Sequence, residues 1–298
     1  MRAAACEFSG RPKRECFALT VPVGSIIARM LILAILLGLL ASLAINSLAD
    51  NLPPDELGVR RPPAWPRCRY CGATHAPAYW LASAAFLVRG GRCEHCTAPR
   101  RWRHVVVELG TALSLAYVAL WAGGDWLKFL SAAVIVVLFI LIAVIDIEHR
   151  LILRVVIFPS AVIIGLMNSL TPGRGPLKTL LGGLAGYGIW LVIFLAAQVF
   201  SAVMGRLRGR PLEEIAFGGG DVNLGGVVGL AVGWSGILLT IPITIFSAAA
   251  FSLLYIGVQS ARRKYSLFTA LPYGPFLILG ALVMYLHGRE FAAWYFGR

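Results

Sequence analysis

The chain has 298 residues, of which 58% are hydrophobic and only 14% are charged. A water-soluble domain cannot bury that much apolar surface, so the composition excludes a soluble enzyme, a disordered chain and a small disulfide-held secreted module. The formal net charge is +13 at pH 7. In a soluble protein this excess would suggest nucleic acid. In a membrane protein, basic residues collect in cytoplasmic loops, so we expect no nucleic-acid partner.

Eight apolar segments are bounded by charged residues or by proline and glycine. A helix needs about 20 residues to cross a bilayer, and each segment is predicted to form a helix in the membrane. The segments are 26–48, 105–121, 127–145, 151–170, 177–204, 222–234, 237–259 and 271–287. The sixth is short and rich in glycine. The predicted fold class is therefore an all-α polytopic integral membrane protein with about eight transmembrane helices that contact membrane lipid.

The basic residues of the connections predict how the helices are oriented, because lysine and arginine in short loops stay in the cytoplasm. Segment 50–104 contains nine arginines, and the basic loops near 150–154, 206–210 and 262–264 fall on the same side when the spans alternate. The connections assigned to the outside, 122–126 and 171–176, contain only Arg174 as a basic residue. Segment 50–104 is therefore predicted to lie in the cytoplasm.

Basic residues ahead of the first helix disagree with this orientation, since they would lie outside. They are Arg2, Arg11, Lys13 and Arg14. Either the strongly basic segment 50–104 overrides them, or translation begins later, for instance at Met30, or they open a cleaved signal peptide with an unusually long apolar run. We divide the chain into a short N-terminal segment 1–25, which is non-native if translation begins later, a first transmembrane helix 26–48, a cytoplasmic domain 50–104 and a transmembrane domain 105–298.

Two CxxC pairs lie in the cytoplasmic segment. Cys68 and Cys71 form the first pair, Cys93 and Cys96 form the second, and 21 residues separate them. Each pair offers two thiolates to one ion, and two pairs complete a tetrahedral Cys₄ zinc site. Four thiolates leave no open position for water, so the pattern predicts a structural Zn²⁺ that holds a small domain together.

The zinc prediction has one alternative and one further piece of support. Redox-active or free thiols are the alternative to zinc, although disulfides are unusual in a reducing cytosol. Tight metal turns often need positive φ, and glycines flank both pairs. These glycines are Gly72, Gly90 and Gly91. Cys6 and Cys16 stand apart and are expected to be free thiols.

Two aspartates stand at the same predicted edge of the membrane. Asp146 ends the apolar run 132–145, and Asp221 follows Gly218, Gly219 and Gly220 and precedes another apolar run. In the predicted topology both carboxylates lie at the cytoplasmic ends of their helices, where they can meet. An ionisable group at a membrane boundary is costly unless it faces a polar cavity, so both are functional candidates. The three glycines allow close backbone approach and a flexible loop.

Each aspartate also has a simpler interpretation. Asp146 can pair with Arg150 one turn later, and Asp221 can be the N-cap of its helix. Together, two neighbouring carboxylates share one proton, so one takes a proton from water while the other polarises a peptide carbonyl. No G-x-S-x-G or H-E-x-x-H motif offers a competing centre. Glu148 is an alternative partner, but two residues along a helix it faces elsewhere.

The motifs together resemble the bacterial type IV prepilin peptidases, also called prepilin leader peptidases, which are GxGD-type membrane aspartyl proteases. The resemblance follows the family's order through most of the chain. It includes Gly38-Leu-Leu-Ala-Ser-Leu-Ala-Ile-Asn46, both CxxC pairs, Ile145-Asp-Ile-Glu-His-Arg-Leu-Ile152, Phe217-Gly-Gly-Gly-Asp221 and Leu271-Pro-Tyr-Gly-Pro-Phe276. Two positions depart from the usual pattern, because Asn223 replaces a lysine and Leu153 replaces a proline.

The resemblance implies that Asp146 and Asp221 are the catalytic pair. They would remove the short basic leader of type IV prepilin or pseudopilin precursors at the cytoplasmic face of the bacterial inner membrane. Many members of the family also methylate the new N-terminus with S-adenosylmethionine. No G-x-G-x-x-G follows a strand, so the methyl donor is expected in the cytoplasmic segment or where it meets the membrane. Glu108 is the one candidate residue for the methyl-donor site. Its position is explained equally well by the general preference for acidic residues in the first turn of a helix.

Two other classes of function remain as alternatives. In a transporter or channel, Asp146 and Asp221 would relay protons or bind a cation, and acids would continue toward the middle of the membrane. The outer halves of the predicted spans contain no acids. A non-catalytic assembly scaffold would instead use the zinc module to bind partners, and exchange of either aspartate for asparagine would leave its function intact.

Overall fold

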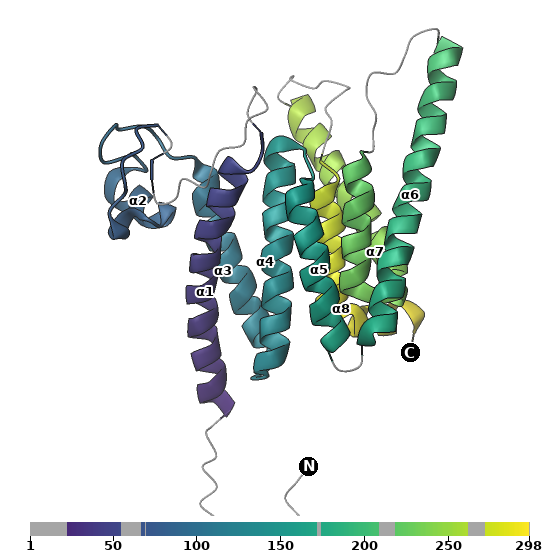
Figure 1. The fold of residues 1–298 in the computed structure, drawn as a ribbon, viewed down its shortest axis with the longest axis horizontal. Coiled ribbons are helices and arrows are strands. Elements are labelled where there is room, and N and C mark those ends of the chain that lie inside the picture. The colour runs from purple at the N-terminus through teal and green to yellow at the C-terminus, as the bar shows by residue number, and fades with distance from the viewer. Residues whose placement is uncertain are drawn as a thin grey trace, which may run out of the picture.

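The structure is a computed structural model, and it describes residues 23–54, 67–68, 70–171, 174–208, 218–261 and 272–297. Long helices lie side by side, and the module that contains the four cysteines sits at one end, next to α1 and α3 (Figure 1). Within these ranges there is no strand, and two isolated β-bridges are the only extended pairing. The predicted all-α membrane class is confirmed.

Seven long helices account for the apolar segments of the described ranges. They are α1 (Val23–Asn51), α3 (Trp102–Ala122), α4 (Trp126–His149), α5 (Arg154–Leu170), α6 (Gly175–Arg208), α7 (Gly219–Ala261) and α8 (Gly274–Phe296). The cysteine module adds η1 (Pro77–Tyr79) and α2 (Ala82–Arg89). Six of the long helices are long and apolar enough to cross a membrane, and α5 is shorter, with 17 residues. The protein is therefore a multi-pass membrane protein.

α7 is broken at Gly233, whose φ of 78° and ψ of 175° are not helical. Leu224 before the break approaches Gly274, and Phe251 after the break packs its ring 5.4 Å from that of Phe276. Both sides of the break therefore reach the first turn of α8, so α7 consists of two antiparallel arms. The arms match the predicted helices 222–234 and 237–259, and each of the eight predicted segments corresponds to a helix or an arm, although residues 151–153 and 272–273 precede α5 and α8.

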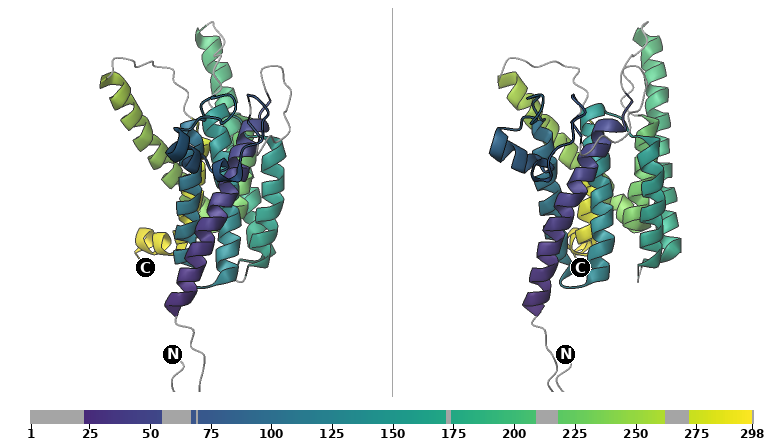
Figure 2. Two further views of the ribbon diagram at one scale, coloured as in Figure 1. Left: turned by 90° about the vertical axis from the view of Figure 1, so that its left-hand side faces the viewer. Right: turned by 60° about the vertical axis from the view of Figure 1, so that its left-hand side comes forward.

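α8 is also interrupted, at His287, where φ is −123° and where the predicted helix ends. The C-terminal segment of α8 turns to lie roughly perpendicular to the other helices, near the end opposite the cysteine module (Figure 2). Its Trp294 and Tyr295 side chains are exposed. Tryptophan and tyrosine favour the membrane–water interface, so this segment is suited to lie along the surface opposite the cysteine module.

α6 and the first arm of α7 meet over glycines. A β-carbon at Gly229 would overlap the carbonyl oxygen of Gly182, and one at Gly186 would overlap that of Gly225. Small residues four positions apart are the pattern that lets membrane helices approach closely. The contact fixes the position of the first arm of α7, whose first turn contains Asp221. Its glycine spacing is visible in the sequence, but we did not predict the contact.

The turn in α7 is held from the connection between α5 and α6. The guanidinium of Arg174 donates to the carbonyl of Ala231 and lies 4.3 Å from the centre of the Tyr285 ring. Asn168 is fully buried and donates to the carbonyls of Leu230 and Ala231 at 2.8 Å. These carbonyls are at the end of a helical arm, where backbone carbonyls lack partners within the helix. Arg174 and Asn168 therefore supply hydrogen bonds that lipid cannot supply.

Several predictions fall on parts of the chain outside the described residues. They concern the N-terminal basic residues Arg2, Arg11, Lys13 and Arg14, the thiols Cys6 and Cys16, and the motif ends Phe217 and Leu271. The division at residues 25, 49 and 104 into separate domains stays a prediction.

Candidate active site and metal centre

The two aspartates lie at the same end of the helices. Asp146 is in the last turn of α4 and is 5% exposed, and Asp221 is in the first turn of α7. Next to Asp221, a β-carbon at Gly220 would lie 2.8 Å from Cβ of Ile152, which follows Asp146 by six residues. This is also the end that carries the cysteine module (Figure 1). The predicted meeting of the two chain segments is therefore present.

The first turn of α8 completes the site. Oδ2 of Asp146 lies against Gly274, where a β-carbon would overlap it and would lie 3.4 Å from Leu224, one turn after Asp221. This oxygen is buried, no described side chain hydrogen-bonds it, and the backbone N–H of Gly274 is the protein group within reach. The negative charges of Asp146 and Asp221 act on each other directly. A buried carboxylate oxygen beside a second carboxylate suits a bound water.

Tyr273 precedes α8 on the same side. Burial, and then the negative charge of Asp221, raise the pKa of Tyr273 to about 12. The phenol therefore keeps its proton and is a hydrogen-bond donor at neutral pH. Neither Tyr273 nor Gly274 was predicted as a site residue. The Tyr-Gly-Pro sequence before an apolar run was the available signal, but only the fold shows that it lies against α4.

The simpler interpretations of the aspartates are wrong. Asp146 forms no ion pair with Arg150 within the described ranges, and Arg150 instead ends α4 with a left-handed φ of 53°. Asp221 is not the N-cap, because α7 already begins at Gly219. The N–H of Gly218 donates to Oδ2 of Asp221 at 3.0 Å, and the N–H of Asp221 donates back to the Gly218 carbonyl at 3.1 Å. The carboxylate of Asp221 therefore accepts the N–H just ahead of α7, as the acid of a capping box does, and this bond fixes the carboxylate.

The three glycines before Asp221 differ in what surrounds them. No atom lies within 4 Å of a β-carbon built on Gly219, and the nearest atom to one on Gly218 is 3.8 Å away. Gly220 alone is pressed against another segment, Ile152. The predicted close approach therefore rests on one glycine.

We expect Gly220→Ala to lower the rate of peptide cleavage about tenfold or more, because the new methyl group must push the start of α7 away from Ile152 in the α4–α5 connection, and small displacements of reacting groups are costly. Gly219→Ala is the matched control. It adds the same methyl group one residue earlier into open space, in a helix that alanine favours. Cleavage rates of the two purified variants test this. Equal rates would show that Gly220 does not set the distance between the acidic segments.

Glu148 does not join the aspartates. Its carboxylate lies 3.2 Å from Nη1 of Arg101 and 2.7 Å from Nη1 of Arg103. Arg103 also pairs with Asp50 at the end of α1, and Nε2 of His104 lies 2.9 Å from Asp50. The alternative in which Glu148 replaces Asp146 is therefore not supported. Instead, this network ties together the ends of α1, α3 and α4.

The two departures from the family pattern have local effects. Nδ2 of Asn223 donates to the carbonyl of Gly219 at 3.2 Å, so this side chain stabilises the start of α7 and supplies no cation. Leu153 is the N-cap of α5 with φ −74°. Proline has nearly the same φ, so leucine allows the helix to restart at the position where proline would.

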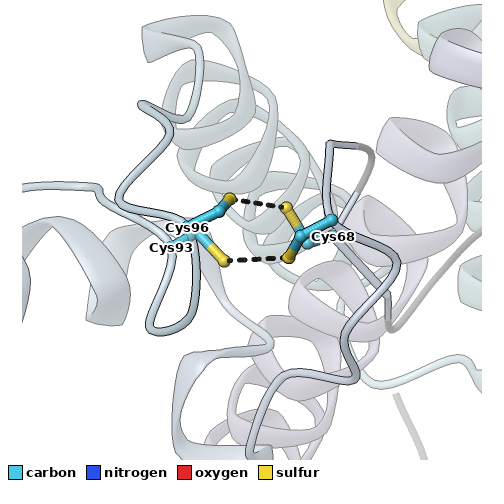
Figure 3. Close-up of side chains that lie close together, drawn as sticks. Cys68, Cys93 and Cys96 are labelled. Carbon is cyan, nitrogen blue, oxygen red and sulfur yellow. Dashed lines mark hydrogen bonds between the residues drawn. The ribbon is translucent and has the colours of Figure 1, made fainter.

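The four predicted cysteines converge in the module that contains η1 and α2. Their sulfur atoms all lie within 4.8 Å of one another, with 3.7 Å between Cys68 and Cys96 and 3.9 Å between Cys71 and Cys93 (Figure 3). A zinc–sulfur bond of about 2.3 Å gives edges of about 3.8 Å in a regular tetrahedron. The distances therefore fit one tetrahedral metal ion.

The backbone turns the thiols inward in the same way in both pairs. The residue after each second cysteine is left-handed, with φ 71° at Gly72 and 57° at Thr97, and an isolated β-bridge closes each turn. The predicted positive φ at Gly72, Gly90 and Gly91 is confirmed. Burial opposes ionisation of Cys93, but backbone N–H groups of Cys96 and His95 and the neighbouring thiols lower its pKa to about 6. The thiolate form of Cys93 is the form that binds a metal ion.

Glu108 lies in the second turn of α3, because α3 begins at Trp102 and has no acid in its first turn. The interpretation of Glu108 as a first-turn acid is therefore wrong. Glu108 is 1% exposed, and its two carboxylate oxygens accept the N–H groups of Ala82 and Ser83. These are the first N–H groups of α2, which Leu81 leaves without a side-chain cap. Glu108 therefore caps a helix of the cysteine module.

These features define a multi-pass membrane protein with paired carboxylates at the mouth of its helices, which is the architecture of a membrane aspartyl peptidase. The family models that match are the type IV leader peptidase family over residues 133–253 and the bacterial peptidase A24 N-terminal domain over residues 36–122. The two models follow one another along the chain, which is therefore similar to the bacterial type IV leader peptidases through most of its length.

Curated relatives agree with the family models. Proteins called prepilin leader peptidase/N-methyltransferase match from Legionella pneumophila (26% identity, 77% of this chain and 75% of the relative), Pseudomonas aeruginosa (26%, 88% and 91%) and Bacillus subtilis (26%, 76% and 84%). No solved structure matches this chain.

Proposed function

We propose that the protein is a membrane endopeptidase that removes the leader peptide of type IV prepilin-like precursors, with Asp146 and Asp221 as the catalytic pair. The observation that carries this proposal is the buried, unpartnered Oδ2 of Asp146 at the mouth where Asp221 and Gly274 meet. The names of the relatives support the substrate class.

The reaction needs both carboxylates. One is ionised and takes a proton from a water molecule, whose oxygen bonds to the carbonyl carbon of the scissile peptide. The other is protonated and gives its proton to the carbonyl oxygen. When the C–N bond breaks, the nitrogen takes a proton and leaves as the amine of the mature pilin. Burial and mutual repulsion of the two charges favour the singly protonated pair that this mechanism requires.

The position of the site fits a substrate with a membrane helix and a basic leader. The described residues at this end of the helices include many arginines, which favours a cytoplasmic orientation in a bacterial inner membrane. The apolar stem of a pilin precursor would then lie among the lipid-facing helices, and its leader would meet the aspartates at the surface. A transporter would need acids farther along the spans, and α7 contains none after Asp221.

A cleavage assay tests the proposal directly. The purified chain in detergent is incubated with a prepilin-like precursor, and the products are measured by mass spectrometry. We expect one cut between the leader and the apolar stem. An intact precursor, with folded protein confirmed by thermal unfolding, would favour a scaffold or transporter.

We further propose that the four cysteines bind a structural zinc ion. A small module rich in loops gains most of its folding energy from such a metal. We expect about one zinc per chain by elemental analysis, loss of that metal in Cys68→Ser, and a lower unfolding temperature. Cys16→Ser is the control, because Cys16 stands apart from both pairs in the sequence. Metal that stays bound in Cys68→Ser would refute the assignment.

We also propose that the protein methylates the amine it creates, as the names of the relatives suggest. S-Adenosylmethionine supplies an activated methyl group. The uncharged amine forms a bond to the methyl carbon, the carbon–sulfur bond breaks with its electrons going to sulfur, and one proton leaves the nitrogen.

A further inference from the structure

A cavity of about 150 Å³ lies between the end of α1, the start of α3 and the cysteine module. One buried water needs only about 10–15 Å³, so the cavity has room for a small organic ligand. Its walls include Asn46 and Ser47 of α1, Trp80 and His75 of the module, and Glu108 of α3. None of these residues takes part in the proposed peptide cleavage.

Two buried polar atoms in this wall lack partners. Asn46 is 7% exposed, and its Nδ2 donates to the carbonyl of His104 at 3.2 Å. That bond fixes the orientation of the amide, so that Oδ1 is a hydrogen-bond acceptor. No described group donates a hydrogen bond to it. The buried hydroxyl of the adjacent Ser47 is likewise without a partner. Buried polar groups are nearly always hydrogen-bonded, so the pair indicates a ligand that donates to both.

The remaining walls narrow the class of ligand. Trp80, Tyr70 and His75 offer flat surfaces, and burial, followed by the charge of Arg100, lowers the pKa of His75 so that its ring is neutral. Three arginines also line the cavity, and they suit a carboxylate. They are Arg67, Arg100 and Arg101. The amide oxygen can accept from an adenine amino group, the flat rings can stack on the adenine, and the arginines can bind a carboxylate. Together they suit an adenosine that carries an amino-acid group.

We infer that this cavity is the site of the methyl donor S-adenosylmethionine, with Asn46 and Ser47 as direct contacts and Glu108 as a positioning residue. The inference rests on the proposed methyl transfer. Glu108 acts through α2, because both of its oxygens are occupied by the N–H groups of Ala82 and Ser83. It therefore fixes the wall of the cavity and leaves the polar contacts to α1.

The cavity lies close to the proposed peptidase site. Asp50 and Arg101 line the cavity, Arg103 pairs with Asp50, and both arginines pair with Glu148, two residues after Asp146. One network of ion pairs thus separates the two sites. This arrangement suits a sequence in which the amine released beside Asp146 moves a short distance to the donor.

Binding of tritiated S-adenosylmethionine to the full chain in detergent tests the inference without relying on turnover. We expect saturable binding to wild type, about threefold to tenfold weaker binding to Ser47→Ala, and about tenfold or greater weakening in Asn46→Ala. Ser42→Ala is the control, because Ser42 lies on the same helix outside the cavity and donates to the Leu39 carbonyl at 2.7 Å. We expect it to bind like wild type.

The unfolding temperature without ligand separates loss of a contact from loss of the fold. Ser47→Ala should unfold at the wild-type temperature, because its hydroxyl has no partner to lose. Equal affinity of wild type and both cavity variants would place the donor elsewhere and overturn the inference. Precursor cleavage by a wild-type protein that binds no donor would overturn it too, while leaving the peptidase proposal intact.

Discussion

Gly229→Ala is expected to prevent stable packing of α6 against α7. The added β-carbon would overlap the backbone carbonyl of Gly182 and would lie 2.8 Å from its carbonyl carbon. Backbone atoms of a helix cannot turn aside as a flexible side chain can, so the two helices must separate. Overpacking typically costs about 1–3 kcal/mol. Separation here also removes the dispersion contacts that hold membrane helices together, so we expect the upper part of that range or more.

Separation of α6 from α7 would also move the arm that begins with Asp221. We therefore expect Gly229→Ala to lower the thermal unfolding temperature in detergent and to abolish peptide cleavage together. Gly188→Ala is the matched control on α6, because no atom lies within 4 Å of its β-carbon position. It should leave both quantities near wild type. Equal unfolding temperatures for Gly229→Ala and wild type would show that the helices are not packed as described.

The sequence was sufficient for the helices and for the convergence of the four cysteines because their signals are local. The length and hydrophobicity of an apolar segment determine whether it forms a membrane helix, and CxxC spacing determines how thiols are presented. The same reasoning predicted separate helices 222–234 and 237–259, whose boundary lies two residues after the break observed at Gly233. Alternation of the helices then brought Asp146 and Asp221 to one end.

The sequence was insufficient where contacts join distant segments. Gly274 lies against Asp146 because α8 packs between α4 and α7, and no local pattern encodes that contact. Glu108 was misinterpreted for the same reason, because the helix that it caps belongs to another part of the chain. The pairing of Glu148 with Arg101 and Arg103 likewise depends on how α3 and α4 end side by side.

Asp146→Asn and Asp221→Asn are each expected to lower the cleavage rate by roughly 10³-fold or more. An amide has nearly the shape of the carboxylate but can neither take up nor release the shared proton. General acid–base catalysis alone contributes about 10²–10⁴-fold. Folding should survive either change, because asparagine adds no buried charge and leaves the volume almost unchanged.

The cleavage rate of the double variant, compared with both single variants under single-turnover conditions, tests most directly whether the two acids act as one unit. Groups that act together show losses that do not add, because the first substitution already removes the function of the pair. We predict that Asp146→Asn/Asp221→Asn cleaves a prepilin-like precursor no more slowly than either single variant. Losses that multiply in the double variant, or a single variant with wild-type rate, would contradict a shared-proton pair.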